Sequence, residues 1–308
     1  MGIVIIRQDD KIEAWKNAIQ TFDPKVEVYS YLEDHSKEEI SMVLVWKPPH
    51  GIIGQYPNLK CIASAGAGVD FIFEEEDLPS VPITRVVDPV LASDMSEFVL
   101  ALTLNHLKNL NTYKADQSAQ QWVPRPYLRI KDVTIGILGL GTLGQAVAAD
   151  MLKLGFKVQG WARSSKELEG ITSFSGPEEL STFLATTSIL VCLLPLTKET
   201  EGILNVDLFE QLPKGSYIIN VARGAHLNAA DLIKALDREQ LSGASLDVFH
   251  TEPLPKTHAL WQHPKVHITP HVASVSDPQA VVPQIMENYY RLESGKALYN
   301  VVSSQKGY

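Results

Sequence analysis

Residues 133–144 read VTIGILGLGTLG, and this stretch determines how the rest of the chain is interpreted. The apolar run 133–138 predicts a buried strand, and glycines at 139, 141 and 144 follow it at once. A helix is expected over 145–154, and a second strand over 156–161. Strand, glycine loop, helix and strand within about thirty residues are typical of a dinucleotide-binding βαβ unit.

Each glycine of this loop has a separate expected role. Gly139 permits the tight turn, Gly141 lets the backbone approach a pyrophosphate, and Gly144 lets the helix pack closely on the strand. The helix N-terminus offers N–H groups and a partial positive charge to the phosphates. The loop therefore predicts a bound dinucleotide.

The residues after the second strand indicate which dinucleotide binds. A site for NAD carries a carboxylate there, about 20 residues beyond the loop, to bind the ribose 2′-hydroxyl. In this chain Trp161 is followed by Arg163 and Ser164, and the first carboxylate is Glu167. A guanidinium can bind a 2′-phosphate through two parallel hydrogen bonds. The sequence therefore predicts NADPH in preference to NADH.

Strand and helix patterns alternate on both sides of this unit, as they do in parallel α/β sheets. The expected strands are 3–6, 26–29, 42–46, 60–64 and 83–87 in a first series, and 133–138, 156–161, 189–194, 216–221, 243–248 and 266–269 in a second. Further helical segments are expected over 11–21, 36–41, 95–119 (one long helix) and 278–294.

The last expected helix, 278–294, can pack against the domain formed by the first series of strands. The cofactor domain is therefore expected to be inserted into the substrate domain. The predicted fold class is α/β, with two Rossmann-like or flavodoxin-like domains and parallel sheets. The substrate domain is expected to comprise 1–97 plus 283–308, and the dinucleotide-binding domain 98–282.

Composition excludes several classes of protein. The net charge of −9 lacks the basic footprint of a nucleic-acid binder. No apolar run reaches the ~18 residues of a membrane span, and residues 3–6 suggest a strand and not a signal peptide. Cys61 and Cys192 lie in apolar runs, which predicts buried thiols in the reducing cytoplasm. No metal site is expected, because clustered metal ligands are absent from the sequence.

Three further segments carry candidate catalytic groups. Arg223, Glu252 and His271 each lie just past the end of an expected strand. Open α/β sheets bind their ligands at the carboxyl ends of their strands. This trio suits the reduction of a 2-keto acid. His271 would donate a proton to the carbonyl oxygen, Glu252 would hold the imidazole, and Arg223 would orient the substrate carboxylate.

Ten motifs carry a resemblance to a known family over nearly the whole chain. They are VWKPP (45–49), GAGVD (66–70), GILGLG (136–141), WARS (161–164), LLPLT (193–197), VARG (221–224), LDVF (246–249), EPLP (252–255), PHVA (270–273) and KGY (306–308). With these motifs in this order, the chain resembles the D-isomer-specific 2-hydroxyacid dehydrogenases, and within them the glyoxylate/hydroxypyruvate reductase A branch.

The resemblance implies the roles of further residues. The amides of Ala67 and Gly68 would bind the substrate carboxylate, and Trp46 would form a wall of the substrate pocket. The cofactor would contact the loop Gly139, Leu140, Gly141, Thr142, Leu143 and Gly144, and also Trp161, Arg163, Ser164, Leu194, Pro195, Ala222 and Asp247. Family members are usually dimers, which implies a homodimer with 95–119 in the interface and Trp122 directed at the partner's active site.

The function implied is the NADPH-dependent reduction of glyoxylate to glycolate and of hydroxypyruvate to D-glycerate. One alternative is a reductase of bulkier 2-keto acids, because the sequence does not show which side chains face the substrate. A second is a nucleotide-sensing binding protein or co-repressor on the same fold. The intact trio favours the enzyme.

Overall fold

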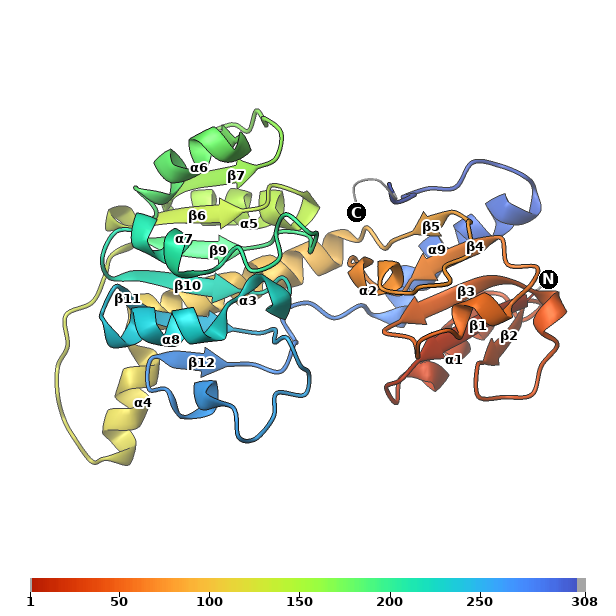
Figure 1. Ribbon diagram of the computed structural model, residues 1–308, viewed down its shortest axis with the longest axis horizontal. Coiled ribbons are helices and arrows are strands. Elements are labelled where there is room, and N and C mark those ends of the chain that lie inside the picture. Colours follow the sequence, from red (N-terminus) through yellow and green to blue (C-terminus); the bar gives the residue numbers. More distant parts are fainter. Residues whose placement is uncertain (1, 304–308) are drawn as a thin grey trace. The chain divides into compact units, whose positions relative to one another are not determined.

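The computed structural model describes residues 2–303 and consists of two compact units (Figure 1). The first comprises Met1–Asp88 with Val275–Tyr308, and the second comprises Pro89–Ser274. The observed borders between the units lie at 88/89 and 274/275. The expected borders, 97/98 and 282/283, are therefore several residues too late in the chain. The first border falls earlier because helix α3 begins at Pro89 and belongs entirely to the second unit. The KGY motif at 306–308 lies outside the described residues.

The first unit is built on a five-stranded parallel sheet of order β2-β1-β3-β4-β5. Its strands are β1 (Gly2–Arg7), β2 (Glu27–Ser30), β3 (Ile40–Trp46), β4 (Cys61–Ser64) and β5 (Ile83–Thr84). Its helices are α1 (Ile12–Phe22), α2 (Asp70–Phe73) and α9 (Pro278–Glu293), with 3₁₀ turns η1 (Lys37–Glu39) and η2 (Ile53–Gln55). Helix α9 packs on α1, where the Tyr290 hydroxyl donates to Asp23 over 2.6 Å.

The second unit is built on a seven-stranded parallel sheet of order β12-β11-β10-β9-β6-β7-β8. Its strands are β6 (Thr134–Leu138), β7 (Lys157–Ala162), β8 (Thr172–Ser175), β9 (Ile189–Cys192), β10 (Ser216–Asn220), β11 (Leu241–Leu246) and β12 (Val266–Ile268). Its helices are α3 (Pro89–Leu107), α4 (Leu110–Ser118), α5 (Thr142–Lys153), α6 (Gly176–Leu184), α7 (Val206–Gln211) and α8 (Ala229–Asp237), with 3₁₀ turns η3 (Ile130–Asp132), η4 (Gly224–His226) and η5 (Ala259–Gln262). The strand order reverses between β6 and β9, where such sheets bind ligands.

The predicted fold class is confirmed: both sheets are parallel and the second unit is inserted into the first. The single helix expected over 95–119 is wrong. Asn109 adopts a left-handed conformation (φ 55°), which ends α3 and starts α4 in a new direction. Apolar spacing continues across this break, so the spacing does not reveal it. Strand β8 was not expected, because Thr172–Ser175 contains a single apolar residue, Phe174, which is too few to form an apolar pattern.

The two thiols lie inside the sheets, as predicted. Cys61 and Cys192 have no solvent exposure, and burial raises the pKa of the first to about 11 and of the second to about 12. Both therefore stay protonated at neutral pH. None of the helices within residues 2–303 is long and apolar enough to cross a membrane.

The two ends of the glycine loop approach each other too closely to admit a side chain. A β-carbon on Gly144 would overlap the Gly139 carbonyl oxygen, so helix α5 can start here only with glycine at 144. Gly139 itself has a φ of +104° and donates its N–H to the Trp161 carbonyl over 2.8 Å. By contrast, a β-carbon on Gly141 would meet nothing within 4 Å.

This difference predicts that the same substitution destabilises the protein at one position of the loop and not at the other. Gly144→Ala forces backbone apart and should lower the free energy of unfolding by about 3 kcal/mol or more. Gly141→Ala, with a φ of −77°, should leave it nearly unchanged. Urea unfolding followed by circular dichroism measures both variants. Equal losses would show that the loop is not held by the Gly139–Gly144 contact.

Candidate active site

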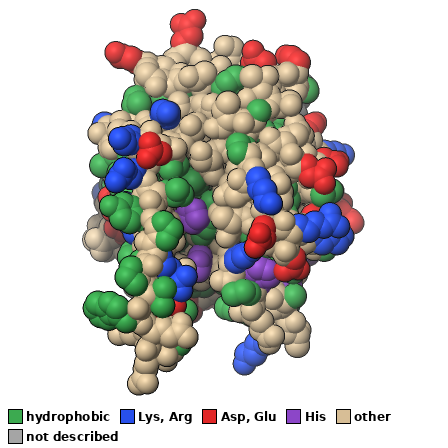
Figure 2. Space-filling view, turned by 90° about the vertical axis from the view of Figure 1, so that its left-hand side faces the viewer, with side chains coloured by type: hydrophobic (Ala, Val, Ile, Leu, Met, Phe, Trp, Pro, Cys, Tyr) green, Lys and Arg blue, Asp and Glu red, His purple; other side chains and the backbone are tan. Residues whose placement is uncertain are grey.

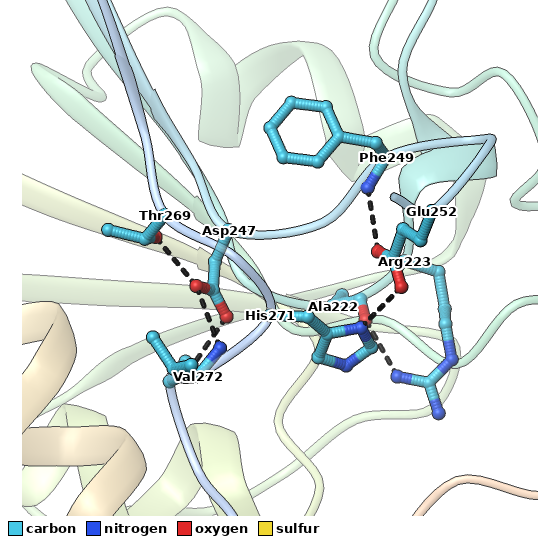
Figure 3. Close-up of polar contacts among 9 residues, drawn as sticks. Ala222, Arg223, Asp247, Phe249, Glu252, Thr269, His271 and Val272 are labelled. Atoms are coloured by element: carbon cyan, nitrogen blue, oxygen red, sulfur yellow. Dashed lines mark hydrogen bonds and ion pairs between the residues drawn. The ribbon is translucent and has the colours of Figure 1, made fainter. Parts of the chain in front are cut away.

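The first catalytic candidate is positioned by a turn at the carboxyl end of β10. The buried Asn220 side chain accepts the Ala222 N–H over 3.2 Å and donates to the Arg223 carbonyl over 3.0 Å. The guanidinium of Arg223 folds back, so that Nη1 donates to the Ala222 carbonyl over 2.7 Å (Figure 3). The side chain of one asparagine therefore shapes the turn that presents Arg223.

Gly224 allows the turns after β10 and β11 to touch. A β-carbon at this position would overlap the backbone of Phe249 and His250. Any other residue would therefore push the Arg223 turn away from the segment that carries Glu252. The contact brings two of the three catalytic candidates into one place.

Asp247, directly after β11, holds the turn that carries His271. Its carboxylate has no solvent exposure and accepts the Thr269 hydroxyl over 2.6 Å, the Val272 N–H over 3.0 Å and the Ala273 N–H over 2.9 Å (Figure 3). The Asp247 carbonyl accepts the N–H of His271 over 2.8 Å. Four hydrogen bonds thus fix the segment 269–273, in which His271 has a left-handed φ of 56°.

His271 and Glu252 form a directly bonded pair. Nδ1 of His271 lies 2.8 Å from Oε2 of Glu252, and the other carboxylate oxygen accepts the Phe249 N–H over 2.9 Å (Figure 3). The side chains are 26% and 19% exposed, so solvent and substrate can reach them. An ionised carboxylate only accepts hydrogen bonds, so Nδ1 carries a proton. The outer nitrogen, Nε2, is therefore the one placed to exchange a proton with a ligand.

The glycine loop and the segment after β7 have the form expected of a dinucleotide site. Helix α5 begins at Thr142, directly behind the loop, and Arg163 and Ser164 are exposed past the end of β7. A hydrogen bond from Thr197 lowers the pKa of the exposed Glu199 carboxyl, and the charge of Arg163 adds a smaller lowering effect. The charge of the Arg163 guanidinium is therefore felt in the loop after β9, which carries Glu199.

The other predicted cofactor residues differ in how far their side chains are exposed to solvent. Leu140, Leu194 and Ala222 are buried, with exposed fractions of only 2%, 7% and 7%, so mainly their backbone is available to a ligand. Thr142 is exposed, while Leu143 and Pro195 are half-buried. The indole of Trp161 donates to the Gly176 carbonyl over 2.8 Å, which directs it toward the start of α6.

The predicted substrate-binding residues belong to the first unit. Trp46 ends β3, and the Ala67–Gly68 turn follows β4. The buried Ser64 hydroxyl accepts the Gly66 N–H over 3.2 Å and donates to the Gly68 carbonyl over 2.7 Å. This closes the turn and leaves Ala67 and Gly68 half-exposed.

The chain is similar to proteins of a known family. Residues 100–273 match the family "D-isomer specific 2-hydroxyacid dehydrogenase, NAD binding domain". A glyoxylate/hydroxypyruvate reductase A of Serratia proteamaculans is 40% identical over the whole of both chains. The chain belongs to the D-isomer specific 2-hydroxyacid dehydrogenase family.

Two solved structures of this dehydrogenase family are similar over almost their full length. One is a D-isomer specific 2-hydroxyacid dehydrogenase from Xanthobacter autotrophicus in complex with NADPH and MES, 40% identical, with a TM-score of 0.94 over 100% of this chain and 99% of that one. The other is an NADPH-dependent glyoxylate/hydroxypyruvate reductase from Sinorhizobium meliloti in complex with NADP and sulfate, 36% identical, with a TM-score of 0.93 over the same shares.

Sequence reasoning did not identify the residues whose side chains hydrogen-bond to the turns that carry the catalytic candidates. Asn220 ends a strand and Thr269 precedes a proline, and neither belongs to a motif that suggests a supporting role. Asp247 was expected beside the cofactor, and the structure shows in addition that its carboxylate holds the His271 turn. Within residues 2–303, no three His, Cys, Asp or Glu side chains lie where they could bind a metal ion together.

The buried carboxylate leads to a prediction for the stability of the dehydrogenase. Asp247→Ala leaves a hydroxyl and two amides without their acceptor and should lower the free energy of unfolding by about 3 kcal/mol or more. Asp237→Ala removes a carboxylate that is 68% exposed and should cost less than about 0.5 kcal/mol. Urea unfolding compares the two. A small loss at Asp247 would mean that the 269–273 turn is held by other contacts.

Proposed function

We propose that this chain catalyses the NADPH-dependent reduction of small 2-keto acids, glyoxylate to glycolate and hydroxypyruvate to D-glycerate. The observation that carries the proposal is the 2.8 Å contact between His271 and Glu252, with Arg223 presented by the neighbouring strand. It is supported by the similarity to the Serratia reductase and to the NADPH-dependent Sinorhizobium reductase.

The residues of the second unit fit NADPH. Gly141 has open space beside its α-carbon, the start of α5 lies directly behind it, and Arg163 and Ser164 are exposed where a 2′-phosphate is expected. When bound, NADPH supplies the hydride for the carbonyl carbon. Leu194, Pro195, Ala222 and Asp247 are proposed to line the cofactor site. They would contact the cofactor mainly through backbone atoms or hold in place the residues that contact it.

The chain's own residues supply the proton and the orientation. His271 donates its Nε2 proton to the carbonyl oxygen as negative charge develops there. Glu252 stabilises the protonated imidazole and prevents rotation of the ring. Arg223 orients the substrate carboxylate and stabilises charge on the carbonyl oxygen. The Ala67 and Gly68 amides are proposed to bind the carboxylate, and Trp46 to border the substrate's side chain.

The first experiment follows the loss of reduced-cofactor absorbance with glyoxylate and hydroxypyruvate, using NADPH and NADH in parallel. We expect turnover with NADPH and much less with NADH. Arg163→Ala should raise the KM for NADPH about tenfold or more and leave the KM for NADH nearly unchanged, because it removes a charged partner of the 2′-phosphate. Lys157→Ala, an exposed cation on β7, is the control.

The catalytic trio is tested in the same assay. His271→Asn should abolish turnover while NADPH still binds, as measured by quenching of tryptophan fluorescence. Turnover with phenylpyruvate but not with glyoxylate would assign the chain to bulkier keto acids. Cofactor binding without turnover on any keto acid would instead favour a nucleotide-sensing protein.

We also propose that the chain forms a homodimer through the apolar surface of α4 and residues 119–129. Leu110, Tyr113, Val123, Tyr127 and Leu128 are exposed here, and Trp122 is 96% exposed. Figure 2 looks onto the side of the molecule where α4 lies in Figure 1 and shows hydrophobic side chains gathered there. Surfaces of this kind mark protein interfaces.

The loop is held in place by Arg125, whose guanidinium makes two hydrogen bonds to Asp116, at 2.9 and 2.8 Å. Sedimentation equilibrium should give twice the chain mass of 34.0 kDa. Trp122→Ser combined with Tyr127→Ser should shift the chain toward a monomer. A monomeric parent protein would contradict the proposal.

A further inference from the structure

One carboxylate of the acidic run 74–77 is buried. Glu75 has a side chain that is only 4% exposed, whereas Glu74, Glu76 and Asp77 are exposed. Runs of like charge usually lie in solvent, and the fold of the first unit encloses this one residue. A buried carboxylate requires partners, because removal of its charge from water costs free energy.

The partners of Glu75 lie in the loop that follows Trp46. Oε2 accepts the Gly51 N–H over 2.7 Å, and Oε1 lies 3.0 Å from Nδ1 of the exposed His50. Both bonds come from one short turn, so Glu75 ties the segment after α2 to the segment after β3.

The turn needs such support because its backbone is strained. Lys47, directly after Trp46, has a left-handed φ of 45°, which side-chain-bearing residues rarely adopt. The Gln8 side chain donates to the Lys47 carbonyl over 3.0 Å and holds one end of the turn. Glu75 holds the other end through Gly51.

Trp46 itself connects this turn to the Ala67–Gly68 turn. A β-carbon on Gly66 would lie 2.8 Å from Cζ3 of the Trp46 indole, so the ring lies directly against the glycine that precedes Ala67. Phe71, at the start of α2, meets the indole edge-on, with ring centroids 5.3 Å apart. A shift of the Trp46 turn would therefore change the space beside the Ala67 and Gly68 amides.

We propose that Glu75 is a positioning residue that fixes Trp46 beside the Ala67–Gly68 turn and thereby limits the size of the 2-keto acid that is accepted. This inference rests on the proposed function. Glu75 acts through the backbone of Gly51 and the side chain of His50 and does not touch the substrate. It affects how the substrate is bound, and the groups that transfer the proton belong to the other unit.

The test compares Glu75→Ala, Glu75→Gln and Glu76→Ala in the full-length protein. Glu75→Ala should raise the KM for glyoxylate roughly tenfold, since a displacement near 1 Å is enough for such a loss. It should also increase the kcat/KM for phenylpyruvate relative to glyoxylate. The affinity for NADPH, measured by fluorescence quenching, should not change. Glu75→Gln keeps an acceptor for Gly51 and should restore most of the loss, and Glu76→Ala should resemble the parent.

The outcomes separate this inference from the proposed function. If the parent is active and Glu75→Ala leaves both the KM and the substrate preference unchanged, the inference is wrong and the function stands. A fall in kcat on every substrate, with weaker NADPH binding, would indicate a general loss of structure and also overturn it. If the parent reduces no keto acid, the proposed function fails, and the inference fails with it.

Discussion

The site depends most on the buried carboxylate of Asp247. Three donors from residues 269–273 converge on it, and the same residue accepts the His271 N–H through its carbonyl. A histidine with a left-handed backbone relaxes to an extended conformation unless its surroundings prevent it. Because the anchor lies at the end of β11 and the turn at the end of β12, sheet pairing and the catalytic geometry are coupled. The Glu252 contact then fixes only the ring.

Residues whose role follows from the end of a strand could be predicted from the sequence. The glycine loop, Arg223, Glu252 and His271 all lie just beyond apolar runs, and parallel strands bring such positions to one edge of a sheet. Residues that act through a bend or a buried contact could not. The break at Asn109 occurs within continuous apolar spacing, and β8 has only one apolar residue, Phe174, from which no pattern can be recognised.

The burial of individual carboxylates also could not be predicted from the sequence. The carboxylates of Asp247 and Glu75 are both enclosed and accept backbone N–H groups, which their sequence positions do not indicate. A residue type indicates its chemistry, but whether the chain surrounds it depends on distant segments. The resemblance to the dehydrogenase family supplied the substrate-side residues, which spacing alone did not identify.

The return of α9 to the first sheet has a consequence for synthesis. Tyr290 bonds to Asp23, and the N–H of Val302 bonds to the carbonyl of Ile83 over 2.8 Å, so residues made after the second unit complete the first. The second unit is one continuous stretch and has its own core. During translation, all residues of the second unit are therefore made before the first unit has all of its own. The N-terminal strands must wait, with apolar faces exposed, until the α9 segment has been made, and chaperones act on segments in that state.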